Sequence, residues 1–142
     1  MEKIEHIGIA VKDLSHSSDL YKRLLGYESY KIEEVKSENV ITEFFKIGES
    51  KIELLQASSG ESAIASFIEK RGEGIHHIAF VVENIIEEMA RLKAQGFQLL
   101  SDEPKKGADN KWVCFVHPKA AGGVLIELCQ EVREETDEKL GY

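Results

Sequence analysis

An internal repeat constrains this chain more than any other feature. Residues 6–11 (HIGIAV) match residues 77–82 (HIAFVV), 71 positions later. Further along, residues 52–56 (IELLQ) match residues 126–130 (IELCQ), 74 positions later. Two matches in the same order and at nearly equal offsets indicate a duplicated structural unit. The 142 residues are therefore expected to form two similar modules.

The first half contains a helix and further strand-like runs. The helix opens near Asp13 and ends at Gly26, with Leu20, Leu24 and Leu25 at helical spacing. Apolar runs bounded by turn residues predict strands over residues 27–35, 40–47 and 51–56. Together with residues 6–11, this half has the order βαβββ.

The second half has the same order. Its helix opens near Asn84, carries Ile85, Met89 and Leu92, and ends at Gly96. Strands are predicted over residues 97–100, 112–117 and 123–130, and a short helix is predicted over residues 62–70 between the halves. We therefore predict an α+β fold of two tandem βαβββ modules within one domain, residues 1–130. Module one is about 4–56, the connection about 57–74, module two about 75–130, and a charged tail follows over 131–142.

The overall charge and hydropathy exclude several partners. The formal net charge is −8 at pH 7, so a nucleic-acid partner is not expected, since phosphate binding needs a basic surface. The chain has neither the roughly 18–20 apolar residues that span a bilayer nor a signal peptide. We therefore expect a soluble cytoplasmic protein with no membrane partner. Cys114 and Cys129 lack metal-type spacing and are expected to be packing residues.

Four ionisable residues stand at the repeated positions. His6 and His77 lie in apolar strands, and Glu53 and Glu127 interrupt two others. Pseudo-twofold pairing of the modules would bring all four to one centre. Buried carboxylates beside imidazoles need a compensating charge, and a divalent cation supplies it. Two nitrogens and two oxygens without thiolate suit Zn, Ni, Co, Mn or Fe(II) and leave positions open for water or substrate.

Two adjacent histidines compete for one ligand position. His76 directly precedes His77, so in a strand the two side chains point to opposite faces. We favour His77 as the ligand because it aligns with His6 in the repeat.

Five stretches of the chain carry a family resemblance. They are residues 5–11 (EHIGIAV), 51–55 (KIELL), 74–80 (GIHHIAF), 102–104 with 107–108 (DEP and GA), and 117–119 with 122–128 (HPK and GGVLIEL). They resemble the vicinal oxygen chelate (glyoxalase and bleomycin resistance) superfamily, and within it most resemble the methylmalonyl-CoA epimerases. The resemblance implies that the modules form a cupped mixed sheet around a divalent metal ion.

The resemblance also implies the site residues and the reaction. It assigns metal ligands at His6, Glu53, His77 and Glu127, with Co, Zn, Ni, Mn or Mg as the ion. Some of these epimerases have glutamine where Glu53 stands, so the ligand set equally resembles that of glyoxalase I. The implied reaction is proton transfer at the carbon between a thioester carbonyl and a carboxylate, through a metal-stabilised enolate.

Epimerisation needs an acid on one face of that carbon and a base on the other. Glu127 is the first candidate, as a ligand able to dissociate. Some relatives carry the second glutamate in the strand before the first IEL, where an ungapped alignment places Thr42 beside Glu43. We therefore expect Glu43 to be catalytic only if a bulge or a loop shift corrects the strand register.

A locally positive segment is the expected handle for coenzyme A. Between residues 104 and 119 four lysines oppose one aspartate, although the whole chain is acidic. We hypothesise that this segment is a lid, with Lys106, Gly107 and Lys119 binding the acyl-CoA substrate. Trp112 either covers the adenine or packs, and packing is favoured. The resemblance further implies a homodimer.

Two alternatives stay open. One is a glyoxalase-type isomerase acting on a thiol hemithioacetal of methylglyoxal; a ring-cleaving dioxygenase is disfavoured because Glu53 would be a surplus ligand. The other is a metal-free binding protein of the same fold, which fits least because all four ligand positions are filled.

Overall fold

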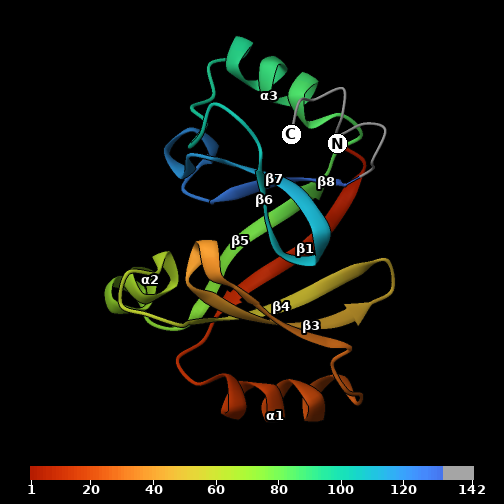
Figure 1. The fold of residues 1–142 in the computed structure, drawn as a ribbon, viewed down its shortest axis with the longest axis vertical. Coiled ribbons are helices and arrows are strands. Elements are labelled where there is room, and N and C mark those ends of the chain that lie inside the picture. Colours follow the sequence, from red (N-terminus) through yellow and green to blue (C-terminus); the bar gives the residue numbers. More distant parts are fainter. Residues whose placement is uncertain (133–142) are drawn as a thin grey trace. The chain divides into compact units, whose positions relative to one another are not determined.

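The order of helices and strands follows the repeat (Figure 1). Module one comprises β1 (Lys3–Ala10), α1 (Leu14–Leu25), β2 (Lys31–Val35), β3 (Val40–Ile47) and β4 (Ser50–Ala57). Module two comprises β5 (Gly74–Val81), α3 (Ile85–Ala94), β6 (Lys105–Lys106), β7 (Lys111–Val116) and β8 (Ile126–Glu131), and α2 (Ala63–Arg71) connects the modules. The predicted α+β fold of two tandem βαβββ modules is confirmed.

The computed structural model describes residues 1–132. These residues fall into two units, which we describe separately. The N-terminal unit is residues 4–79, and the C-terminal unit is residues 1–3 together with residues 80–132. The predicted tail, apart from its first two residues, lies outside the described residues.

Each helix begins at a side chain that caps it. The carboxylate of Asp13 accepts a hydrogen bond from the backbone N–H of His16, and the amide oxygen of Asn84 accepts one from Glu87. Such caps satisfy backbone donors that the first helical turn leaves without partners. The first helix ends at Gly26, whose φ of 86° suits glycine. Both starts are therefore where the sequence predicts them.

The register of the N-terminal sheet decides which side chains share a face. Within residues 4–79 the strand order is β2-β3-β4-β1-β5, with β1 and β4 parallel and β2, β3 and β4 antiparallel. Glu53 lies opposite Gly8 on one side and Phe44 on the other. Paired residues point to the same face. Residues of odd number on β4 therefore share their face with Thr42 and Phe44 of β3.

The two helices of this unit cover opposite faces of its sheet. Leu14, Tyr21 and Leu25 of α1 pack on the cluster that includes Phe45 and Leu54. On the other face, the cluster around Leu55 includes residues from α2 and β1, namely Ile64 and Ala10. Figure 1 shows α1 beneath β3 and β4. Two leucines of α1 that lie at helical spacing, Leu20 and Leu24, are exposed.

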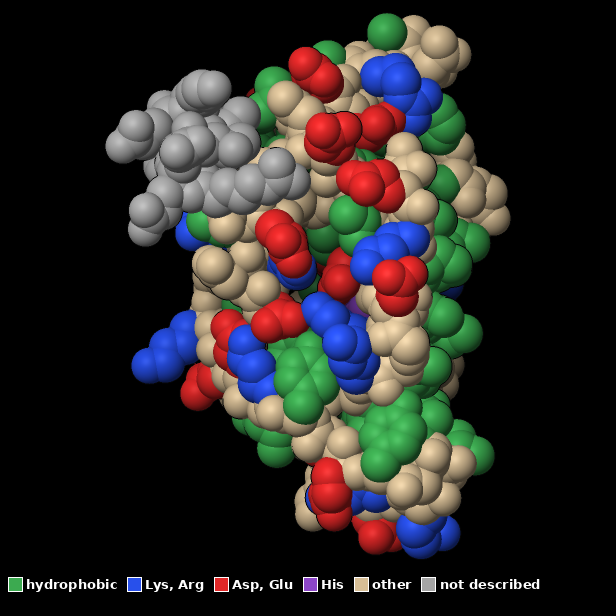
Figure 2. All heavy atoms as spheres, turned by 90° about the vertical axis from the view of Figure 1, so that its right-hand side faces the viewer, with side chains coloured by type: hydrophobic (Ala, Val, Ile, Leu, Met, Phe, Trp, Pro, Cys, Tyr) green, Lys and Arg blue, Asp and Glu red, His purple; other side chains and the backbone are tan. Residues whose placement is uncertain are grey.

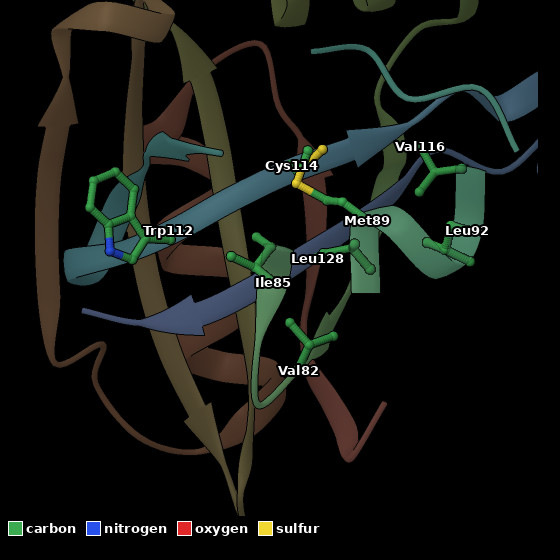
Figure 3. Close-up of a cluster of buried hydrophobic side chains, with 8 residues drawn as sticks. All are labelled: Val82, Ile85, Met89, Leu92, Trp112, Cys114, Val116 and Leu128. Carbon is green, nitrogen blue, oxygen red and sulfur yellow. The ribbon is translucent and has the colours of Figure 1, made fainter. Parts of the chain in front are cut away.

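The C-terminal unit has its own apolar core. Strands β6, β7 and β8 pair antiparallel in that order. The helix α3 presents the predicted side chains Ile85, Met89 and Leu92 to these strands (Figure 3). The cluster is completed by Val82, Trp112, Cys114, Val116 and Leu128.

The prediction of a strand over residues 97–100 was wrong. This segment forms a single isolated bridge, between Leu99 and Val116. The Ser101 hydroxyl then donates to the carbonyl of Glu103 at 2.8 Å in a turn. Pro104 follows and has no N–H to continue a ladder. Pairing with β7 therefore resumes only at the two residues of β6.

The surface carries charges of both signs. Figure 2 shows acidic and basic side chains interspersed on the face that it displays. An anion that binds to such a surface would be recognised by the positively charged side chains nearest to it.

Among residues 1–132, none of the helices has the length and apolar character to cross a membrane.

Candidate metal and catalytic residues

The N-terminal unit brings three of the predicted ligands together. Nε2 of His6 lies 2.9 Å from Nε2 of His77, and Nδ1 of His6 lies 3.0 Å from Oε2 of Glu53. All three side chains are buried. They come from β1, β5 and β4, which are neighbours in the sheet. Residues far apart in the sequence thus form one polar cluster.

Gly8 makes room for this cluster. A Cβ atom at this position would lie 2.6 Å from Nδ1 of His77, which is closer than a side chain tolerates. The imidazole of His77 therefore lies directly over the backbone of β1. In the repeat, Gly8 corresponds to Ala79, so the glycine is specific to the strand that faces this ring.

Burial keeps the histidines of β5 neutral. Burial and then the imidazoles of His6 and His76 lower the pKa of His77 well below 6.5. Burial also lowers the pKa of His76 to about 4. The His76 ring packs edge-on against Phe67 of α2, with ring centres 5.0 Å apart. Its Nδ1 lies 2.9 Å from Nδ1 of His77, so the two rings are in contact and the prediction that they point to opposite faces was wrong. A neutral imidazole retains the lone pair with which histidine binds metals.

An ion pair between buried Glu5 and half-buried Lys51 contacts His6. Oε1 of Glu5 lies 3.1 Å from Nδ1 of His6 and 3.1 Å from Nζ of Lys51. Burial opposes the ionisation of Glu5, but the hydrogen bond from His6 and the charge of Lys51 outweigh it and lower the pKa from 4.5 to about 2. Sequence reasoning missed both residues. Only their positions in the sequence could have identified them: Glu5 directly precedes His6, and Lys51 is two residues before Glu53 and so lies on the same face of the strand.

These residues fit a divalent cation. The ligand atoms that Glu5, His6 and Glu53 offer lie within 4.8 Å of one another. Neutral imidazole nitrogens and carboxylate oxygens are ligands that such ions accept. Two carboxylates beside two imidazoles also form a buried cluster whose charge a cation would balance.

The fourth predicted ligand lies in the C-terminal unit. Glu127 is buried on β8, and its Oε2 accepts a hydrogen bond from the thiol of Cys129 at 2.6 Å. Positions 127 and 129 share one face of the strand because side chains alternate. The two cysteines are free and buried, as expected of packing residues, but Cys129 also contacts a candidate ligand.

The structure places Glu43 away from Glu53. The pairing of β3 with β4 is continuous from Val40 to Ile47, without a bulge. Glu43 therefore lies on the opposite face and accepts hydrogen bonds from Ser18 at 3.0 Å and Ser29 at 2.5 Å. Thr42, which is also buried, takes the face of Glu53.

The predicted substrate-binding residues lie around β6 and β7. Lys106 is exposed on β6, with its Nζ 4.9 Å from the ring centre of Trp112. Gly107 follows it, and a Cβ there would touch the methyls of Val113 at 3.0 Å. Lys119 is exposed in a short 3-10 helix, η3 (Pro118–Ala121). Trp112 packs in the core of this unit, as favoured from the sequence.

Comparisons with known proteins agree with this arrangement. Residues 5–115 match the family model of the glyoxalase/bleomycin resistance protein/dioxygenase superfamily. The ethylmalonyl-CoA/methylmalonyl-CoA epimerase of Cereibacter sphaeroides is 41% identical over 130 residues, which cover 90% of this chain and 97% of that protein. The mitochondrial methylmalonyl-CoA epimerase of Homo sapiens is 39% identical over 129 residues, which cover 90% and 73%.

A solved structure extends the similarity to three dimensions. It is a variant of methylmalonyl-CoA epimerase from Streptomyces coelicolor in complex with 2-nitronate-propionyl-CoA. The TM-score is 0.90 at 33% sequence identity, and the match covers 94% of this chain and 99% of that one.

Proposed function

Because this chain belongs to the methylmalonyl-CoA epimerases of the glyoxalase/bleomycin resistance protein/dioxygenase superfamily, we propose that it interconverts the (R) and (S) forms of methylmalonyl-CoA. The observation that carries the proposal is the buried cluster of His6, His77 and Glu53, which offers metal ligands in a chain similar to these enzymes along most of its length.

The metal site is proposed to comprise His6, Glu53, His77 and Glu127. The first three cluster in the N-terminal unit. Glu127 joins them by its place in the repeat, where it matches Glu53. A bound divalent ion such as Co, Zn, Ni, Mn or Mg would act as a Lewis acid toward the two carbonyl-type oxygens of the substrate. His77 is held neutral for this role by burial.

Glu127 is proposed to carry one of the two protons. Its carboxylate is buried and accepts a hydrogen bond from the thiol of Cys129. Carboxylates are among the side chains that serve as general acids and bases in enzymes. The hydroxyl of Thr42, on the face of Glu53, is far too weak an acid and base to replace a glutamate.

Lys106, Gly107 and Lys119 are proposed to bind the acyl-CoA. The two lysines are exposed and can reach phosphate or carboxylate groups. Gly107 follows Lys106 directly, and the Val113 side chain leaves little room for a Cβ at this position, so Gly107 would contribute its backbone to the binding of the acyl-CoA. The homodimer implied by the family resemblance stays a prediction.

The test is isotope exchange in deuterated water. The metal-loaded protein is incubated with one epimer of methylmalonyl-CoA, and α-deuterium and the second epimer are measured by mass spectrometry and chiral analysis. We expect both to appear. Turnover of the hemithioacetal of methylglyoxal without α-exchange would instead assign a glyoxalase-type activity. Protein that binds no divalent metal would contradict both enzymes.

A further inference from the structure

The contact between Cys129 and Glu127 is not explained by packing alone. The thiol sulfur lies 2.6 Å from Oε2 of the carboxylate, and both side chains are buried. In this contact the thiol donates and the carboxylate accepts. A hydrogen bond to an ionised acceptor is stronger than one between neutral groups.

The repeat shows that this donor is specific to module two. Position 129 corresponds to position 55, where β4 has a buried leucine. Leu55 packs against Ala10 and Ile64 and offers no donor to Glu53, whose carboxylate contacts His6 instead. The same strand position is thus apolar beside one candidate ligand and a hydrogen-bond donor beside the other.

We propose that Cys129 is a positioning residue for Glu127, an inference that rests on the proposed function. Its S–H holds Oε2 and so fixes the rotation of the carboxylate about its last side-chain bond, which is otherwise broadly distributed. Cys129 is two residues from Glu127 on the same strand, so both side chains lie on one face of the sheet. A buried donor on the same strand is rigid enough to define the geometry of a ligand.

Three variants test this role in the full-length, metal-loaded protein. Cys129→Val keeps the approximate volume and removes the donor, whereas Cys129→Ser keeps a donor. Cys114→Val is the matched control, because Cys114 is also buried on the neighbouring strand but contacts Ser101. Circular dichroism and thermal unfolding establish that each variant is folded.

We expect Cys129→Val to lower kcat for α-proton exchange about tenfold with KM unchanged, which corresponds to loss of one hydrogen bond to a charged group. Cys129→Ser should recover most of the rate, and Cys114→Val should match the wild type. The affinity for Co²⁺, measured by competition with a chelator, should fall in the valine variant and recover in the serine variant.

Three results would overturn the inference. Exchange and Co²⁺ affinity in Cys129→Val could equal those of Cys114→Val, or the serine variant could be as impaired as the valine variant. A sulfur-to-cobalt charge-transfer band that disappears in Cys129→Ser would make the thiol a metal ligand instead. Failure of the wild type to exchange the α-proton would refute the proposed function, and the Co²⁺ affinities would still decide the role of Cys129.

Discussion

The two IEL strands of the repeat surround the same glutamate differently. On β4, Glu53 contacts the imidazole of His6, which in turn contacts the ion-paired Glu5. On β8, Glu127 accepts a hydrogen bond from the thiol of Cys129. Duplication has preserved the carboxylates while their supports have diverged. We therefore expect the two carboxylates to differ in role, with Glu53 as a fixed ligand and Glu127 as the proton carrier.

The largest expected effect follows from exchanging these two glutamates for their amides. Glu127→Gln removes the proposed proton carrier and should reduce α-deuterium exchange about a thousandfold, within the range for loss of a general acid or base. Glu53→Gln keeps an oxygen ligand, and some related epimerases have glutamine there. It should retain exchange at saturating metal while the metal affinity falls about tenfold.

The measurement is exchange at several metal concentrations, followed by mass spectrometry. Equal losses in the two variants at saturating metal would show that the carboxylates have the same role. A larger loss in Glu53→Gln would reverse the assignment of ligand and proton carrier.

The second prediction concerns Gly8 on β1 and the matching Ala79 on β5. Gly8→Ala introduces a Cβ that would overlap the His77 ring, whereas the equivalent position on β5 is already Ala79. Displacement of this imidazole should weaken metal binding about 10–100-fold, as for other losses of ligand orientation. Isothermal titration with Co²⁺ measures it.

Gly107→Ala is the control, because its new Cβ would meet the side chain of Val113 first and not that of a proposed metal ligand. It should leave metal affinity unchanged. Undiminished affinity in Gly8→Ala would mean that His77 does not ligate the metal from its present position.

Much of the candidate metal site could be predicted because each ligand position occurs twice in the repeat. Matching positions identified His6, Glu53 and His77 without any knowledge of contacts. Glu5 and Lys51 escaped because they have no counterpart in module two, where His76 and Leu125 occupy the equivalent positions. Their role depends on a cross-strand pairing that one strand's pattern does not reveal.

The sequence pattern was misleading in two segments, residues 97–100 and the helix α1. The apolar run over residues 97–100 favoured a strand, but a turn at Ser101 and the missing N–H of Pro104 end its pairing after one bridge. On α1, Leu20, Leu24 and Leu25 lie at helical spacing, but the side chains that pack on the sheet are those of Leu14, Tyr21 and Leu25. Helical periodicity defines a stripe but not which of several apolar residues lies at its centre.

The third prediction concerns the charged support that only module one possesses. Glu5→Gln removes the negative charge that pairs with Lys51 and His6 and should lower the free energy of unfolding by about 2 kcal/mol at pH 7. The folded-state pKa of Glu5 is lowered from 4.5 to about 2, so its stabilisation is present above 4.5 and is lost as the pH falls toward 2.

Urea unfolding of metal-free protein across this range gives the measurement. The difference between wild type and Glu5→Gln should shrink as the pH falls from 4.5 toward 2. A difference that stays constant with pH would mean that the ionised carboxylate contributes nothing through its charge.

The smallest effect on catalysis is expected from Glu43→Gln. Glu43 lies on the face of the sheet covered by α1, opposite to Glu53, and its Oε2 is held by Ser18 and Ser29. The amide oxygen of glutamine can accept the same hydrogen bonds, so we expect stability to change by only about 1 kcal/mol. We expect α-proton exchange to continue at the wild-type rate.

Deuterium incorporation from each epimer separately is the decisive measurement. A residue that serves one face of the substrate would, when removed, stop exchange from one epimer and spare the other. Such one-sided loss in Glu43→Gln would require β3 to shift its register by one residue during catalysis, and equal rates from both epimers would leave the second proton carrier to a group other than Glu43.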